Sequence, residues 1–116
     1  MDKRRTRTDA ELERQYRDAF YEAVGSGRLS IGQAVAAMRR ISKLTQPEFA
    51  RHRGLSVQIL RRIEADNANP TVDTLEKIAG IFGLQVGFVP KRSDSISARD
   101  LMPIAQQRAE GERRSE

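Results

Sequence analysis

The segment from Thr45 to Pro70, TQPEFARHRGLSVQILRRIEADNANP, constrains the fold more than any other part of the chain. Thr45 and Glu48 have the spacing of a capping box, in which two side chains satisfy backbone N–H groups at the start of a helix. Gly54 suits the end of that helix, because glycine adopts the left-handed conformation at little steric cost. Ser56 is placed to cap a second helix. The segment therefore predicts two short helices joined by a tight turn.

The second predicted helix separates apolar from polar side chains. Leu60 and Ile63 share the face that we expect to be buried. An amide can pair with an adenine edge, a guanidinium with a guanine edge, and a valine can touch a thymine methyl group. A solvated helix face is the alternative for any one of these residues, but the whole arrangement favours DNA. The candidate base-reading residues are Val57, Gln58, Arg61 and Arg62.

The same stretch resembles the helix-turn-helix of the Cro/Xre class, which is found in phage repressors. The resemblance covers about residues 30 to 90. Lys43 and Asp66 depart from it, since the family often has glycine at both positions, and we expect turns there that are tighter or differently shaped. The matching positions are Thr45-Gln46, Phe49-Ala50, Gly54, Ser56, Leu60, Ile63-Glu64, Asn69-Pro70, Leu75, Ala79 and Leu84.

The resemblance also implies roles for individual residues. It implies that Gln46 contacts phosphate and braces the recognition helix, while residues 57, 58 and 62 approach bases. It further implies a structural salt bridge between Arg39 and Glu64, which joins the first and third helices of the unit. Phosphate contacts set register on DNA without reading sequence. The candidates for DNA-backbone contact are Gln46, Arg51, Arg53, Asn67 and Asn69, although the two asparagines are equally typical of turns.

Charge supports a polyanionic partner. The chain has 116 residues and a net charge of +5, and residues 30–66 hold seven basic and three acidic side chains, a net charge of +4. The excess therefore lies on the proposed DNA-binding unit. Charge alone does not distinguish DNA from RNA or from a membrane surface. The length is that of one domain with a modest core.

Several classes of function lack their sequence signals. There is no cysteine and a single histidine, His52, so we expect neither thiol chemistry nor a metal site. No Ser/His/Asp arrangement, glycine-rich phosphate loop or paired-carboxylate motif is present, so we expect no enzyme and no cofactor. No apolar run reaches membrane-spanning length. We expect a cytoplasmic protein.

The flanking segments complete the predicted domain organisation. Residues 1–8 predict a flexible basic arm, and residues 9–27 an N-terminal helix that ends at Gly25-Ser26-Gly27. Tyr16 and Phe20 lie on its apolar stripe, which we expect to pack either on the core or across a dimer. Residues 28–92 are the DNA-binding domain. Residues 93–116 predict a polar, disordered tail.

Residues 84–90, LQVGFVP, break the helical period and predict a short strand. A lone strand in a helical chain needs hydrogen-bonding partners for its backbone. The same strand of a second copy is the simplest partner, which predicts a homodimer with an antiparallel pair of strands. The candidate dimerisation residues are Leu84, Val86 and Phe88.

The sequence thus predicts an all-α, lambda-repressor-like helix-turn-helix bundle with an extra N-terminal helix and a dimerising C-terminal strand. We expect a repressor that binds double-stranded DNA at a near-palindromic operator. The ending GLQVGFVPKR further resembles HipB-like antitoxins, which implies an autoregulated toxin–antitoxin operon and a HipA-like kinase toxin as partner. A free-standing Xre-family regulator is an alternative. A protein–protein adaptor on the same scaffold is another, and salt-dependent DNA binding would separate it from a repressor.

Overall fold

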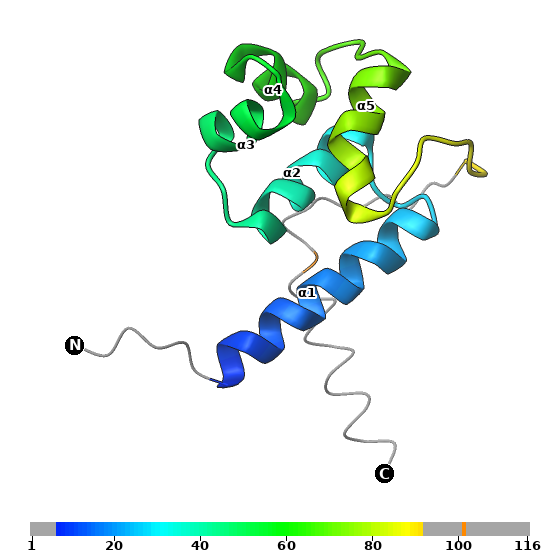
Figure 1. Cartoon of the computed structure of the whole chain (residues 1–116). Coiled ribbons are helices and arrows are strands. Elements are labelled where there is room, and N and C mark those ends of the chain that lie inside the picture. Colours follow the sequence, from blue (N-terminus) through cyan, green and yellow to red (C-terminus); the bar gives the residue numbers. More distant parts are fainter. Residues whose placement is uncertain (1–6, 92–100, 102–116) are drawn as a thin grey trace.

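The computed structural model describes residues 7–91 and residue 101, with side chains from residue 9 onward. Within these residues it is all-helical and contains no strand. Helix α2 is central, since it contacts α1, α4 and α5 (Figure 1). The elements are α1 (Arg7–Gly25), α2 (Ile31–Ser42), α3 (Gln46–Arg53), α4 (Val57–Glu64), α5 (Val72–Ala79) and the 3₁₀ turn η1 (Gly80–Phe82).

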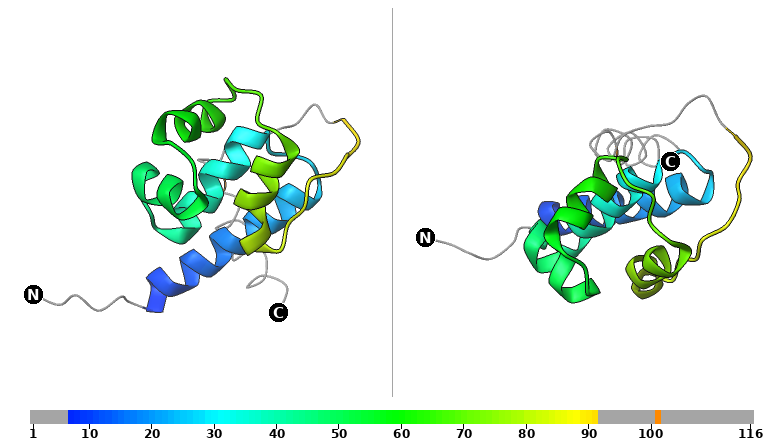
Figure 2. Two further views of the ribbon diagram at one scale, coloured as in Figure 1. Left: turned by 45° about the horizontal axis from the view of Figure 1, so that its top comes forward. Right: turned by 90° about the horizontal axis from the view of Figure 1, so that it is seen from above.

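Helix α1 runs along one side of the bundle, away from α3 and α4 (Figure 2). Its apolar stripe packs on the core of the same chain, because Tyr16 is only 8% exposed and Phe20 is fully buried. Burial raises the pKa of the Tyr16 hydroxyl, and Arg40 opposes that shift. The Tyr21 hydroxyl donates to the carbonyl oxygen of Phe82 at 2.9 Å, which ties α1 to η1. The aromatic stripe is therefore occupied within the chain and does not face a second copy.

The start of α2 is fixed by a residue that follows α4. Ser30 and Gln33 form a capping box. In addition, the Asp66 carboxylate accepts from the Ser30 hydroxyl at 2.6 Å and from the Gly32 N–H at 2.8 Å. A negative charge at a helix N-terminus is favourable. The close approach needs a glycine, because a Cβ atom at Gly32 would lie 2.5 Å from the carbonyl oxygen of Ile63.

Two turns of the bundle use left-handed residues that are not glycine. Lys43 has a φ of 60° at the end of α2, and Asp66 has a φ of 56° after α4. These are the two positions where the resembled family often has glycine. Both turns therefore have the left-handed conformation that glycine favours. Each turn carries the steric strain of a side chain at positive φ.

The core gathers side chains from all the helices. Leu101 joins it as a helical residue that is fully buried, although the tail around it was expected to be polar. The rest of the tail expected at 93–116 lies outside the described residues. So does the arm at 1–8, except that its last two residues begin α1. The largest fully buried side chains are Phe20, Val35, Phe49, Leu60, Ile63, Ile78 and Leu101.

The strand predicted at residues 84–90 is not present in the single chain. The segment leaves η1 and returns to the turn between α1 and α2, where Gly27 makes room for the side chain of Val89 (Figure 2). The Val86 N–H donates to the Glu76 carboxylate at 2.7 Å in place of a strand partner. A strand requires a neighbouring strand, and the described residues of one chain offer none. Of the candidate dimerisation residues, Leu84 packs partly against the core, Val86 is exposed and Phe88 is fully exposed.

Candidate nucleic-acid interface

Helices α3 and α4 are each eight residues long and are joined by a tight turn. The Thr45–Glu48 capping box begins α3, and its hydrogen bonds lower the pKa of the Glu48 carboxyl. Gly54 ends α3 in the left-handed conformation with a φ of 70°. The Ser56 hydroxyl then accepts from the Ile59 N–H and begins α4. The helix–turn–helix expected from the sequence is therefore present, with the caps that were assigned to it.

Helix α4 is anchored on one face and open on the other. Leu60 is fully buried and Ile63 is 2% exposed. Gln58 and Ile59 are exposed, and within the described residues the Gln58 side chain has no hydrogen-bond partner. Val57 differs from the prediction. It is partly buried against the core, because it lies three residues before Leu60 on the same helix face.

The two arginines of the open face are held differently. The Arg62 Nε donates to the carbonyl oxygen of Asn67 at 3.2 Å, so this side chain follows the loop after α4. The Arg61 Nε donates to the Gln46 side-chain oxygen at 3.2 Å, so this side chain turns towards the start of α3. Both side chains are exposed. The four predicted base-reading residues therefore do not form one outward row.

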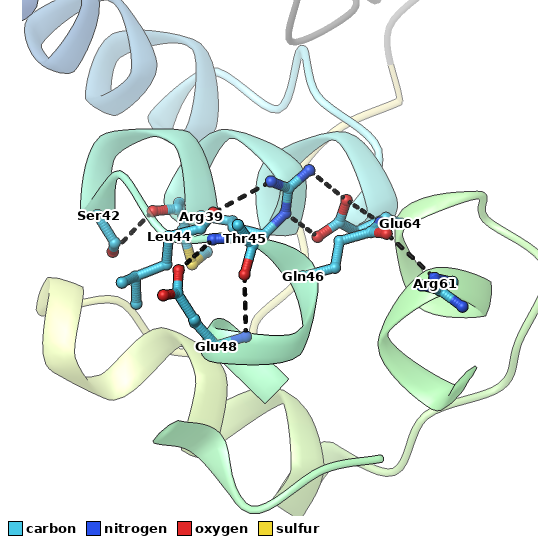
Figure 3. A network of polar contacts seen from close by, with 9 residues as sticks. Arg39, Ser42, Leu44, Thr45, Gln46, Glu48, Arg61 and Glu64 are labelled. Atoms are coloured by element: carbon cyan, nitrogen blue, oxygen red, sulfur yellow. Dashed lines mark hydrogen bonds and ion pairs between the residues drawn. The ribbon is translucent and has the colours of Figure 1, made fainter. Parts of the chain in front are cut away.

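Beneath this face lies the ion pair that the resemblance implies (Figure 3). The Arg39 guanidinium donates to Glu64 through Nε at 2.8 Å and Nη2 at 3.0 Å, and through Nη1 to the Leu44 carbonyl oxygen at 3.2 Å. The hydrogen bond to Glu64 is the main cause that raises the pKa of Arg39. The Gln46 amide donates to the same carboxylate at 3.1 Å. Side chains of α2, α3 and α4 are thus joined at one point.

The predicted DNA-backbone residues have unequal surroundings. Arg51, Asn67 and Asn69 are exposed and accessible. The Arg53 guanidinium instead lies over the Phe49 ring, 4.6 Å from its centroid, and burial lowers its pKa. Its Nε is buried and has no hydrogen-bond partner among the described residues. Arg53 therefore covers the core as a cation–π partner, a role that the sequence analysis did not assign.

The loop after α4 shapes the edge of the open face. A hollow of about 410 Å³ lies between Ile59 and Arg62 of α4 and the residues from Ala68 to Thr74. Thr71, which caps α5, lines it. The exposed Ile59 also borders it and does not tuck against the core. Sequence reasoning missed this hollow, because it depends on the path of the loop.

The described part of the chain shows neither a metal site nor a membrane-spanning helix. No group of three His, Cys, Asp or Glu side chains there could hold a metal ion. No helix there is long and apolar enough to cross a membrane.

Comparison with known proteins agrees with this geometry. Residues 35–89, which contain α3, the turn and α4, match the family described as Helix-turn-helix. This match and the relative described next support the resemblance of the segment to the helix-turn-helix of the Cro/Xre class. The chain is also 41% identical over 61 residues to the "Immunity repressor protein" of Bacillus phage phi105. That alignment covers 53% of this chain and 42% of the relative, so the chain spans less than half of the relative's length. No solved structure matches the chain significantly.

Proposed function

We propose that this chain is a sequence-specific, DNA-binding transcriptional repressor that acts in the cytoplasm as a homodimer on a near-palindromic operator. The observation that carries the proposal is the open face of α4. On this face Gln58, whose amide has no partner among the described residues, and Arg62 are exposed four residues apart, while Leu60 and Ile63 are buried on the opposite side of the helix. A helix of this kind, preceded by a capped helix and a tight turn, suits the major groove.

The charge and the relative support the same proposal. Residues 30–66 carry a net charge of +4, from seven basic and three acidic side chains. Such a surface attracts DNA of any sequence and makes binding salt-dependent. The similar phage protein is itself named as a repressor. A free-standing regulator is therefore the form of the proposal that we favour.

The proposal is tested with two duplexes of equal length, one selected from a random pool by the wild-type protein and one unselected. Gln58→Ala and Arg62→Ala should each weaken binding to the selected duplex by roughly 1–3 kcal/mol and leave the unselected duplex almost unchanged. Arg51→Ala is the control, because its exposed charge should serve both duplexes equally. The base-reading assignment is wrong if all three variants lower binding to both duplexes by one factor.

The antitoxin proposal rests on the ending GLQVGFVPKR alone. If it holds, co-expression with the protein encoded by the neighbouring gene should give a stable complex and relieve growth arrest by that protein. A chain that binds its operator tightly and forms no such complex is a free-standing regulator. An adaptor on the same scaffold would bind the selected and the unselected duplex equally weakly, through charge alone.

A further inference from the structure

Arg61 is held by a chain of hydrogen bonds that begins inside the protein (Figure 3). The Arg39 guanidinium holds Glu64, the Glu64 carboxylate holds the amide of Gln46, and the oxygen of that amide holds the Nε of Arg61 at 3.2 Å. The Glu64 side chain is only 8% exposed, whereas Arg61 lies at the surface. The bonds thus run from a nearly buried carboxylate to a surface cation.

The chemistry of Glu64 sets the direction of every bond in this chain. An ionised carboxylate only accepts, so Gln46 must turn its NH₂ group towards it. The Gln46 oxygen then faces outward, where only a donor satisfies it. The guanidinium of Arg61 is that donor. Both polar atoms of the Gln46 amide therefore have a protein partner that fixes the amide's orientation, and one N–H and one lone pair remain open.

The position of Gln46 decides what Arg61 can reach. In a helix-turn-helix, the N-terminal residues of the second helix contact base edges, while the first helix crosses the DNA backbone. Gln46 is the first residue of α3, the helix that crosses the backbone. Arg61 lies more than one turn after the start of α4 and is bonded to α3. Its guanidinium is thereby held on the backbone side of the interface.

We propose that Arg61 is a preset phosphate clamp and that Gln58 and Arg62 read the bases without it. The inference rests on the proposed DNA-binding function and corrects the sequence-based assignment of Arg61 as a base reader. Its Nε is engaged by Gln46, and in the described part of the chain its two terminal nitrogens have no protein partner. Two parallel donors on a planar fork match the geometry of a phosphate group.

The test measures the affinity of Arg61→Ala for the selected and unselected duplexes across a range of salt concentrations. One phosphate contact contributes about 0.9 to the slope of log affinity against log salt on B-DNA. Arg61→Ala should therefore make that slope shallower by about 0.9. It should also weaken binding to both duplexes by the same factor. Arg62→Ala is the matched control from the neighbouring position, and it should weaken the selected duplex by the larger factor.

A second variant separates the clamp from its support. Gln46→Ala keeps the charge of Arg61 but removes the bond that holds it, so both affinities should fall while the salt slope stays close to that of the wild type. Thermal unfolding of each variant shows whether the fold is intact, and a purely structural role would not change the salt slope.

The outcomes are distinguishable. If Arg61→Ala behaves like Arg62→Ala, or leaves both affinities unchanged, the clamp is refuted while DNA recognition stands. A wild-type protein that binds neither duplex at any salt concentration refutes the proposed function and the clamp together.

Discussion

At the residue scale, Lys43 and Asp66 show how one backbone conformation can serve two purposes. Both residues have positive φ, and both stand where the resembled family often has glycine. Among the described residues, the Lys43 side chain forms an exposed ion pair with Glu13, at 2.7 Å. Asp66 uses its carboxylate to hold the start of α2. The strain at Lys43 is therefore offset by no more than an exposed ion pair among the described residues, whereas the strain at Asp66 is offset by two hydrogen bonds.

Replacing each residue by glycine should change stability in opposite directions. Lys43→Gly should raise the free energy of unfolding by about 0.5 kcal/mol, since relief of roughly 1–2 kcal/mol of left-handed strain exceeds the loss of a surface ion pair and the added freedom of the unfolded chain. Asp66→Gly should lower it by about 1–2 kcal/mol, because two hydrogen bonds to a charged acceptor are lost. Urea denaturation measures both changes.

Asp66→Asn is the control for this pair. Asparagine tolerates positive φ but lacks the charge that favours a helix start. Its stability should lie between those of the wild type and Asp66→Gly. An Asp66→Gly protein as stable as Lys43→Gly would show that the carboxylate contributes nothing to the start of α2.

At the scale of elements, the contact between α2 and α4 depends on the absence of a side chain. Gly32 in the first turn of α2 lies against the backbone of Ile63 near the end of α4. Backbone cannot move aside as a flexible side chain can. This contact therefore sets the separation of α2 and α4. It thereby also sets the position of Glu64 on α4 relative to Arg39 on α2.

Gly32→Ala should destabilise the protein by about 1–3 kcal/mol, the usual cost of overpacking a well-packed contact. Gly80→Ala is the matched control. Gly80 has ordinary helical angles, and nothing lies within 4 Å of a Cβ atom placed there. Alanine should therefore stabilise the protein at that position by about 0.4–1 kcal/mol. Thermal or urea unfolding of the two variants provides the measurement, and equal effects would contradict the close approach of α4.

Also at the scale of elements, helix caps and turns could be predicted from the sequence, whereas contacts between distant residues could not. Caps and turns depend on close neighbours in the sequence, so Thr45, Gly54 and Ser56 could be assigned correctly from local spacing. The bond from Asp66 to Gly32 joins residues 34 positions apart, and no local pattern indicates it.

Contacts within the site were missed for the same reason. The Arg39–Glu64 pair could be predicted only because the resemblance supplied it. The bond from Arg61 to Gln46 and the stacking of Arg53 on Phe49 depend on how the helices meet. Val57 was placed outward on chemical grounds, although its spacing from Leu60 indicates the core side.

At the scale of the whole molecule, the proposed homodimer requires an interface between two copies. Tyr16 and Phe20 are buried within their own chain, so the aromatic stripe of α1 is not available to a partner. Phe88 is the opposite case, with a relative exposure of 107%. It stands in the segment that would gain a strand partner from a second copy. A dimer built there would place two recognition helices roughly 34 Å apart, one turn of DNA.

Phe88→Asp should give a folded monomer that binds one half-site weakly. The substitution removes no contact within the chain, because the side chain is fully exposed, but it places a charge in the expected interface. Analytical ultracentrifugation should show a dimer for the wild type and a monomer for the variant, with the same helical circular dichroism. Val72→Asp, at an exposed apolar position at the start of α5, is the control and should remain dimeric. A Phe88→Asp protein that still sediments as a dimer would place the interface outside residues 84–90.

The Arg39–Glu64–Gln46–Arg61 chain has a consequence for how such a protein can evolve. Each member of this hydrogen-bond chain orients the next. A change at Gln46 or Glu64 should therefore disturb both the fold and the proposed phosphate contact of Arg61. Gln58 takes no part in this hydrogen-bond chain. Among the described residues Arg62 is bonded to the backbone carbonyl of position 67, which is present whatever residue stands there. Under the proposed function, substitutions at 58 and 62 should therefore change the preferred operator while Arg61 keeps its phosphate contact.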